Sequence, residues 1–252
     1  MVGFVKAIRA VYRDSRKDED IAWNVYVARP LAAILVWALR ATPLTPNQVT
    51  FLGAAIFFAA AAALVALPGA MGFLVAALIV QLSYLFDCAD GQLARIKDMT
   101  SEVGSYLDFL IDEIKALLLV GAVGMRLWVV DGHTYWLLVA IGGLFVVATA
   151  TSLTNFVRRP EYAGKQIAPG ESARARPMPK TLIGKAVWLV EGVARYLIHY
   201  PSWIIWVALI GFFVPVDPAL LFLVPFLGVY VLYLGRTTLA ILWKLGRPGF
   251  YE

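Results

Sequence analysis

Six apolar runs constrain what this chain can fold into more than any other feature of its sequence. Over the whole chain 61% of the residues are hydrophobic, only 15% are charged, and the mean hydropathy is +0.75. This balance is too apolar for an ordinary soluble domain and is typical of an integral membrane protein. Runs of about 20 apolar residues form helices long enough to cross a bilayer. We therefore expect an all-α membrane protein with six transmembrane helices, at residues 47–67, 70–86, 104–127, 134–156, 198–214 and 218–242.

A helix-start signal precedes the first run. Thr45 is a good N-cap residue, and Pro46 suits the first helical position because its missing N–H needs no partner there. From Asn47 to Leu67 the helix would be about 31 Å long at a rise of about 1.5 Å per residue, enough to cross the hydrocarbon. We therefore divide the chain into a cytosolic and interfacial N-terminal segment, residues 1–46, and a six-helix domain, residues 47–252.

Two further segments are predicted to lie in the headgroup region instead of crossing the membrane. Residues 21–41 are mostly apolar but carry Arg29, Pro30 and Arg40, so an interfacial helix is favoured over a full span. Residues 181–197 place Lys, Glu and Arg among apolar residues and predict a second interfacial helix. Between the fourth span and this helix, the Pro- and Gly-rich segment 160–180 predicts an irregular cytosolic loop.

The distribution of basic residues predicts the orientation of the spans, because cytosolic loops near span ends are rich in Lys and Arg. Residues 1–20 mix charges without a continuous apolar core, so they do not resemble a signal peptide and are expected in the cytosol. On the opposite side Arg126 is the one clear Lys or Arg. Both termini are therefore predicted to be cytosolic, and the net charge of +5 needs no nucleic-acid partner. The basic residues on the cytosolic side are Arg95, Lys97, Arg158, Arg159, Lys165, Arg174, Arg176, Lys180, Lys185, Lys244 and Arg247.

Four carboxylates, Asp87, Asp90, Asp108 and Asp112, lie between long apolar runs. Ionised side chains near a bilayer interior are costly, so a group of them implies partners such as metal ions. The spacings of three and four residues place each pair on one helix face, and the polar segment 97–102 allows the two helices to be antiparallel. All four carboxylates are therefore predicted to converge. Oxygen ligands without a nearby histidine favour Mg²⁺, Mn²⁺ or Ca²⁺ over zinc.

Small residues and one arginine accompany the carboxylates. Glycine costs about 1 kcal/mol relative to alanine within a helix, so Gly91 suggests a close approach of another group to the backbone. Ala94 and Gly104 are also small, and Arg95 offers a bidentate fork to a phosphate. Together these residues suit a ligand with a pyrophosphate group. The alternatives are close helix packing at the glycines and a membrane-anchoring charge at Arg95.

Neither the cysteine nor the histidines of the chain make convincing metal ligands. Cys88 lies within the acidic segment, but a small buried thiol is favoured over a ligand. His133 and His199 have no ligand-like spacing to each other or to a carboxylate.

Eight positions of the acidic segment resemble the signature of the CDP-alcohol phosphotransferase family. Two pairs of these positions are adjacent in the chain, Asp90-Gly91 and Ala94-Arg95, and each pair counts as one element of the signature. Two, two, eight, three and three residues separate the successive elements. The six predicted spans, the interfacial N-terminal helix and the helix start at Pro46 also resemble that family. The matching positions are Asp87, Asp90, Gly91, Ala94, Arg95, Gly104, Asp108 and Asp112.

The resemblance implies that an acceptor hydroxyl attacks the β-phosphorus of a CDP-linked alcohol and that CMP is released, as in phospholipid synthesis. It also implies two divalent ions, Mg²⁺ or Mn²⁺, and a homodimer. Asp112 would be the general base and a further metal ligand. Ser101 has the alternative role of capping a helix, and Asn47 that of starting one. The implied metal ligands are Asp87, Asp90 and Asp108, and the implied nucleotide site comprises Gly91, Ala94, Arg95 and Gly104, with Asn47, Thr50 and Ser101 as further candidates.

The substrates are not fixed by this signature. A CDP-diacylglycerol donor would take a polar alcohol acceptor, whereas a CDP-amino-alcohol would take diacylglycerol, and we favour CDP-diacylglycerol. Arg158, Arg159 and Lys165 are candidate contacts for a phosphorylated acceptor, with membrane orientation as their alternative role. A different class of function, a cation transporter or channel, would need acidic residues near the midplane of several spans, but here they gather toward the cytosolic end.

Overall fold

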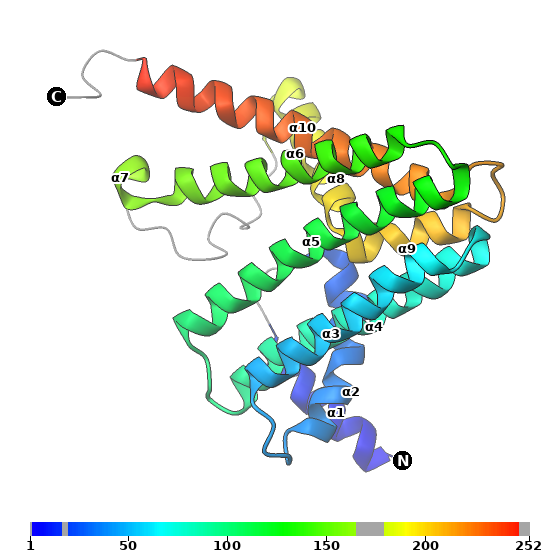
Figure 1. Cartoon of the computed structure of the whole chain (residues 1–252). Coiled ribbons are helices and arrows are strands. Elements are labelled where there is room, and N and C mark those ends of the chain that lie inside the picture. The colour runs from blue at the N-terminus through cyan, green and yellow to red at the C-terminus, as the bar shows by residue number, and fades with distance from the viewer. Residues whose placement is uncertain (1, 17–19, 165–178, 247–252) are drawn as a thin grey trace. The chain divides into compact units, whose positions relative to one another are not determined.

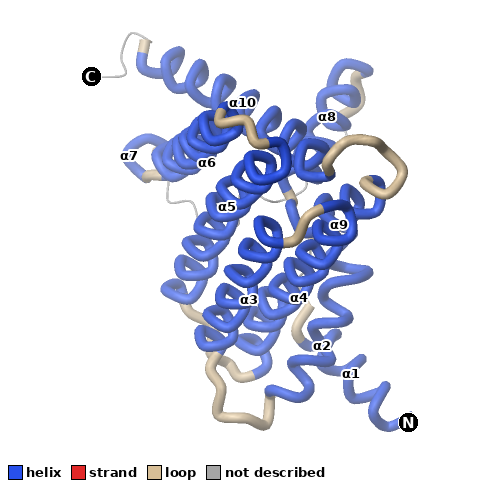
Figure 2. The backbone as a smooth tube through the Cα atoms, turned by 45° about the vertical axis from the view of Figure 1, so that its right-hand side comes forward, coloured by secondary structure: helices blue, strands red, loops and turns tan. Residues whose placement is uncertain are grey.

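Every secondary-structure element in the described part of the chain is a helix (Figures 1 and 2). The computed structural model describes residues 2–16, 20–164 and 179–246. The chain forms two compact units, Met1–Lys115 and Ala116–Glu252, and the fifth helix continues from the first into the second. The helices are α1 (Val2–Asp14), the π-helical turn η1 (Asn24–Ala28), α2 (Arg29–Leu39), α3 (Pro46–Ala66), α4 (Gly69–Ile96), α5 (Glu102–Asp131), α6 (Tyr135–Arg158), α7 (Pro160–Ala163), α8 (Leu182–Ile198), α9 (Tyr200–Ile210) and α10 (Pro218–Leu245).

The start of α3 confirms the helix-start signal in the sequence. The Thr45 side chain accepts a hydrogen bond from the Gln48 backbone N–H, and the Gln48 side chain accepts one from the Thr45 N–H. Pro46 occupies the first turn, where its missing N–H leaves no partner unsatisfied. This reciprocal capping fixes the start of α3 at Pro46, the predicted first helical position.

Helices α3 and α4 lie side by side in the first unit (Figures 1 and 2). A Cβ atom added at Gly53 would lie 3.1 Å from the Phe86 Cβ atom and 3.3 Å from the Ser83 carbonyl oxygen. The Ser83 hydroxyl donates a 2.7 Å hydrogen bond to the Gly53 carbonyl oxygen. The two backbones therefore approach closely just before Asp87, because glycine leaves room for them.

Helix α4 continues well past the end of the predicted second span at residue 86. It reaches Ile96, so Asp87 and Asp90 lie within the helix, as their spacing predicted, and α4 ends where the polar segment 97–102 begins. At about 1.5 Å per residue its 28 residues extend about 42 Å, longer than the hydrocarbon of a typical bilayer. The last turns of α4 thus carry the acidic residues on a rigid element.

Within the first unit, the N-terminal segment is helical and packs against α4. Residues 24–39 form η1 and α2, within the predicted interfacial helix at residues 21–41, and α2 contacts α4. Helix α1, which the sequence analysis did not predict, packs on α2 and α4. Val11 is buried in a shared apolar core, and the Tyr12 hydroxyl donates to the Val25 carbonyl oxygen.

In the second unit α6 and α10 lie side by side, and α8 and α9 also contact α10. The Arg126 side chain of α5 is buried and forms two hydrogen bonds with Asp217, of 3.1 and 3.2 Å. Asp217 also accepts a hydrogen bond from the Ala219 N–H and so caps α10. At the end of α5, hydrogen bonds from Trp136 and Tyr135 hold the pKa of the exposed Asp131 carboxyl below its ordinary value.

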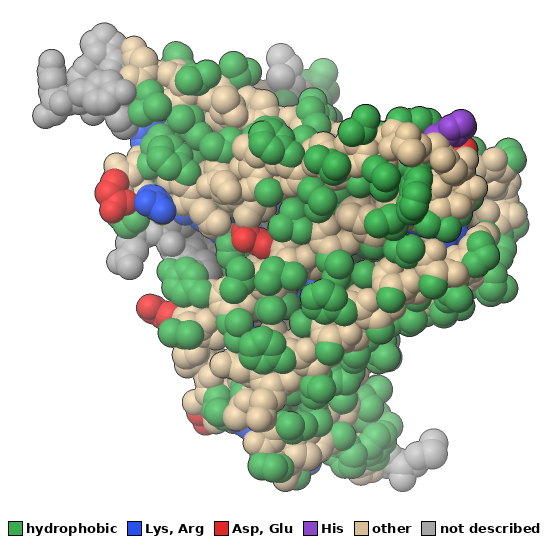
Figure 3. All heavy atoms as spheres, viewed as in Figure 1, with side chains coloured by type: hydrophobic (Ala, Val, Ile, Leu, Met, Phe, Trp, Pro, Cys, Tyr) green, Lys and Arg blue, Asp and Glu red, His purple; other side chains and the backbone are tan. Residues whose placement is uncertain are grey.

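Four described helices are long and apolar enough to cross a membrane: α3, α4, α6 and α10. Helices α8 and α9 become a fifth candidate if the bent pair counts as one span. Exposed apolar side chains are spread over the face shown in Figure 3, and on α3 they include Phe51 and Phe58. With their composition, these helices indicate an integral membrane protein.

Two of the six predicted spans differ from the expectation. Helix α5 covers the predicted third span but is not one of the candidate spans, and its apolar run carries Lys115 and Arg126. Helix α9 has 11 residues in place of the predicted span at 198–214, and it meets α8 at an angle of 79°. Helix α9 begins at Tyr200 with Pro201 in its first turn, and this proline cannot continue the preceding helix, which explains the break.

The segment between α6 and α8 is partly helical where the structure describes it. Residues 160–163 form the short helix α7 within the predicted loop at 160–180. The predicted helix at 181–197 is present as α8, capped by Thr181. Lys165, Arg174 and Arg176 lie outside the described residues.

Candidate active site

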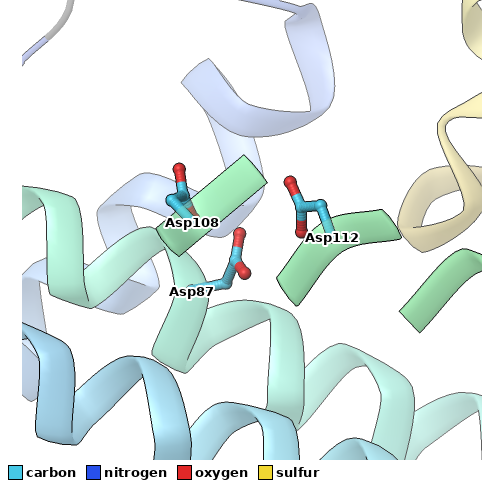
Figure 4. Close-up of side chains that lie close together, drawn as sticks. All are labelled: Asp87, Asp108 and Asp112. Carbon is cyan, nitrogen blue, oxygen red and sulfur yellow. The ribbon is translucent and has the colours of Figure 1, made fainter. Parts of the chain in front are cut away.

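Three of the four predicted carboxylates meet in the first unit. Asp87 comes from α4, and Asp108 and Asp112 lie one turn apart on α5 (Figure 4). One carboxylate oxygen of each residue lies within 4.8 Å of the corresponding oxygens of the other two. Such oxygen donors suit a hard divalent cation, so the side chains present fit the metal chemistry predicted from the sequence.

Asp90 is not a member of this group of three. Its side chain is buried and accepts a 2.6 Å hydrogen bond from the Thr50 hydroxyl. Thr50 is itself buried on α3, so this bond joins α3 to the acidic turn of α4. The sequence predicted that all four carboxylates converge, and the structure gathers three of them while Asp90 meets Thr50. The role of Asp90 as a metal ligand stays a prediction.

A lysine that the sequence analysis did not select completes the group. The Lys115 ammonium forms an ion pair with Asp87 and lies 3.6 Å from an Asp112 carboxylate oxygen. Its side chain is 3% exposed, whereas that of Asp112 is 50% exposed. A lone lysine three residues after Asp112, within an apolar run, was the signal that could have identified it.

Arg95 lies over Gly91 at the end of α4. A Cβ atom added at Gly91 would meet only the Arg95 guanidinium, at 3.7 and 3.8 Å, so close helix packing does not explain this glycine. The Arg95 Nε atom donates a 2.7 Å hydrogen bond to the Ser15 carbonyl oxygen. Its Nη2 atom is buried and has no hydrogen-bond partner among the described residues. A buried guanidinium donor without a partner suits an anionic ligand.

The start of α5 brings the remaining candidates together. Ser101 accepts a 3.0 Å hydrogen bond from the Gly104 N–H, which is the capping role that the sequence left open. A Cβ atom added at Gly104 would lie 3.1 Å from the Ser101 hydroxyl oxygen and 3.8 Å from the Asn47 side-chain oxygen. Asn47 of α3 therefore lies near the start of α5. Ala94 accepts a hydrogen bond from the Met99 N–H, which closes the turn after α4.

Cys88 of α4 and Lys97, the residue that follows this helix, have structural partners. Cys88 is buried in the apolar core shared with α1 and α2, in agreement with the favoured interpretation as a buried thiol. The Lys97 ammonium donates to the carbonyl oxygens of Thr42 and Leu44, at 2.7 and 2.8 Å. Lys97 therefore joins the end of α4 to the connection that precedes α3.

A family model described as CDP-alcohol phosphatidyltransferase matches residues 43–214, which is more than half of the chain and includes every predicted site residue. A comparison with curated proteins found no match. The chain therefore belongs to the CDP-alcohol phosphatidyltransferase family of transferases, as the signature predicted. Enzymes of this family use CDP-alcohols and membrane lipids and generally depend on divalent metal ions.

Proposed function

We propose that this enzyme transfers the phosphatidyl group of CDP-diacylglycerol to the hydroxyl group of a polar, anionic acceptor in phospholipid synthesis. The observation that carries the proposal is the convergence of Asp87, Asp108 and Asp112, with oxygens within 4.8 Å of one another, inside the family signature. In the reaction a bond forms between the acceptor oxygen and the β-phosphorus. The bond between this phosphorus and the oxygen shared with CMP breaks, and CMP leaves.

Asp87, Asp108 and Asp112 would hold divalent cations, Mg²⁺ or Mn²⁺, and we propose two ions with Asp90 as a further ligand. When bound, such ions offset the charge of the pyrophosphate and stabilise the departing CMP. The four aspartates lie on α4 and the first part of α5, both continuous helices, so their spacing is maintained by rigid elements.

Asp112 is proposed as the general base. Its side chain is the most exposed of those in the ion pairs around Lys115, so an acceptor hydroxyl can reach it. Its carboxylate would take the proton of that hydroxyl as the new bond to phosphorus forms. A group positioned in this way contributes roughly 10²- to 10⁴-fold to the rate.

The nucleotide would lie along the Gly91 face of α4. Arg95, whose guanidinium lies over Gly91, has a buried donor available for a phosphate oxygen. The other proposed contacts are Ala94 and Gly104, with Asn47, Thr50 and Ser101 as further candidates.

For the membrane arrangement we propose six spans, with α5 as the third and the α8–α9 pair supplying the fifth. Pairing with Asp217 lowers the cost of Arg126 within α5. Both termini and the carboxylates would face the cytosol, and α2 would lie at the interface. We retain the division into residues 1–46 and a six-helix domain at 47–252, and a homodimer, as parts of this proposal.

The acceptor is proposed to be anionic because basic residues follow the fourth span. Arg158 ends α6 and Arg159 follows it, whereas Lys165 lies outside the described residues. The alternative substrates are a CDP-amino-alcohol donor and diacylglycerol as acceptor. A CMP-release assay with both kinds of donor distinguishes them from CDP-diacylglycerol and a polar acceptor.

The test is CMP release by the purified protein in detergent micelles with Mg²⁺ or Mn²⁺, over a panel of CDP-alcohol donors and acceptors. Asp112→Asn should abolish acceptor-dependent release. Asp98→Asn is the matched control, since Asp98 is exposed and has φ 53°, a conformation that asparagine also adopts readily. Release that persists in Asp112→Asn would contradict the assignment of the base. An absence of release with every pair would contradict the reaction and favour an ion-binding protein.

A further inference from the structure

Lys115 lies within the carboxylate group, although the eight-position signature does not include it. The residue is 2% exposed, and its ammonium is ion-paired with Asp87 and 3.6 Å from Asp112. Burying a charge is costly unless it is paired. The two neighbouring carboxylates therefore compensate for the cost of burying the Lys115 charge.

We propose that Lys115 is a resident counter-ion of this group and competes with divalent cations for Asp87 and Asp112. In the ion-free enzyme its ammonium holds the two carboxylates in place. When a divalent cation is bound, Lys115 has to share or release the Asp87 oxygen with which it is paired. Lys115 is thus a positioning residue that weakens ion binding and keeps the ion exchangeable. The inference rests on the proposed function in one respect, that these carboxylates bind the ion.

The physical reason for such a counter-ion is the closeness of the carboxylates. The oxygens of Asp87, Asp108 and Asp112 lie within 4.8 Å of one another, and like charges at this separation repel strongly in a partly desolvated site. One ammonium offsets a part of that charge. It also repels a second cation that approaches the same oxygens, so the stabilisation of the ion-free state lowers the affinity for the ion.

The sign of the effect separates this role from a merely structural one. If Lys115 only supported the local fold, its removal would loosen the carboxylates and weaken ion binding. If it competes with the ion, removal of its charge strengthens binding and at the same time destabilises the ion-free protein. A comparison of ion affinity and thermal stability in one variant therefore decides between the two roles.

The experiment is a titration of the full-length protein in detergent micelles with Mn²⁺, without any CDP-alcohol and at one fixed pH. Free Mn²⁺ is followed by electron paramagnetic resonance. Lys115→Met should bind the first Mn²⁺ about tenfold more tightly than the wild type. Without divalent ions, the midpoint of thermal unfolding of Lys115→Met should be lower than that of the wild type. On addition of Mn²⁺ it should rise by more than the midpoint of the wild type does.

Two matched variants serve as controls. Lys115→Arg keeps the charge, and Lys97→Met removes a lysine whose ammonium contacts the carbonyl oxygens of Thr42 and Leu44. Both should bind Mn²⁺ within about threefold of the wild type, since neither removes a charge from the carboxylate group. If Lys115→Met does not fold, Lys115→Gln removes the charge but keeps a hydrogen-bond donor, and the same increase in affinity is expected.

Unchanged or weaker Mn²⁺ binding by the neutral variants would overturn the proposal. The titration contains no substrate, so it is independent of the transfer reaction. Tighter binding in Lys115→Met together with no CMP release by the wild type would support the counter-ion and contradict the reaction. CMP release by the wild type without tighter Mn²⁺ binding in Lys115→Met would support the reaction and contradict the counter-ion.

Discussion

Helix α5 carries two buried cations with different surroundings, Lys115 in the first unit and Arg126 in the second. Arg126 forms two hydrogen bonds with Asp217, and Asp217 also caps α10. Lys115 instead faces two carboxylates of a larger group and forms its pair with one of them. The pairing of Arg126 with a carboxylate that also caps a helix indicates a structural role. Lys115 instead lies among several carboxylates, whose excess negative charge indicates a site for a further cation.

The sharpest test of this comparison exchanges one aspartate in each region for asparagine. Asp87→Asn removes a proposed ion ligand and is expected to reduce acceptor-dependent CMP release about 10³-fold, in the range found for groups that act on the transition state. Asp217→Asn should leave this rate within about threefold of the wild type, because it changes only the capping pair. A similar loss of rate in both variants would remove the distinction between the regions.

Replacement of the structural cation should affect stability and not ion binding. Arg126→Met removes the cationic partner of Asp217 and is expected to lower the free energy of unfolding by about 3 kcal/mol. Thermal unfolding in detergent micelles measures this change, and a Mn²⁺ titration of the same sample should match the wild type. An altered Mn²⁺ affinity in Arg126→Met would mean that this pair also influences the carboxylate group.

Two hydrogen bonds between α3 and α4 provide a smaller test. Thr50→Val removes the donor to the buried Asp90, which should cost about 1–2 kcal/mol of stability and reduce CMP release about tenfold. Ser83→Ala removes the donor to the Gly53 carbonyl oxygen and should cost about 1 kcal/mol without changing the rate. An unchanged rate in Thr50→Val would show that Asp90 does not take part in the site.

The smallest change in stability is expected at the start of α3. Thr45→Ala removes the side-chain half of the capping box and should lower the stability by about 1 kcal/mol, measured by thermal unfolding. CMP release should remain unchanged, because Thr45 contacts only the first turn of α3. A large loss of activity would indicate that the position of Asn47 depends on this cap.

The residues that the sequence predicted correctly belong to local patterns. The Thr45 N-cap and the placement of Asp108 and Asp112 one turn apart on a helix follow from turn chemistry and spacing. Family membership followed from eight residues at fixed spacing, which a family model confirms. Local rules suffice for such features because each depends on neighbours along one helix.

The features that the sequence did not predict depend on contacts between distant residues. Lys115 was not selected because a lone lysine in an apolar run has many possible partners, and only the structure pairs it with Asp87. Likewise, only the structure shows that the hydroxyl of Thr50 on α3 donates a hydrogen bond to Asp90 on α4. The short helix α1 was not predicted, and only the structure shows it packed on α2 and α4.

The central claim, that the carboxylates of α4 and α5 bind divalent ions for phosphatidyl transfer, is tested most directly by acceptor-dependent CMP release as a function of divalent ion concentration. We expect no release after chelation with EDTA, recovery on addition of Mg²⁺ or Mn²⁺, and no recovery in Asp87→Asn. CMP release that persists without divalent ions, or that Asp87→Asn retains in full, would contradict it.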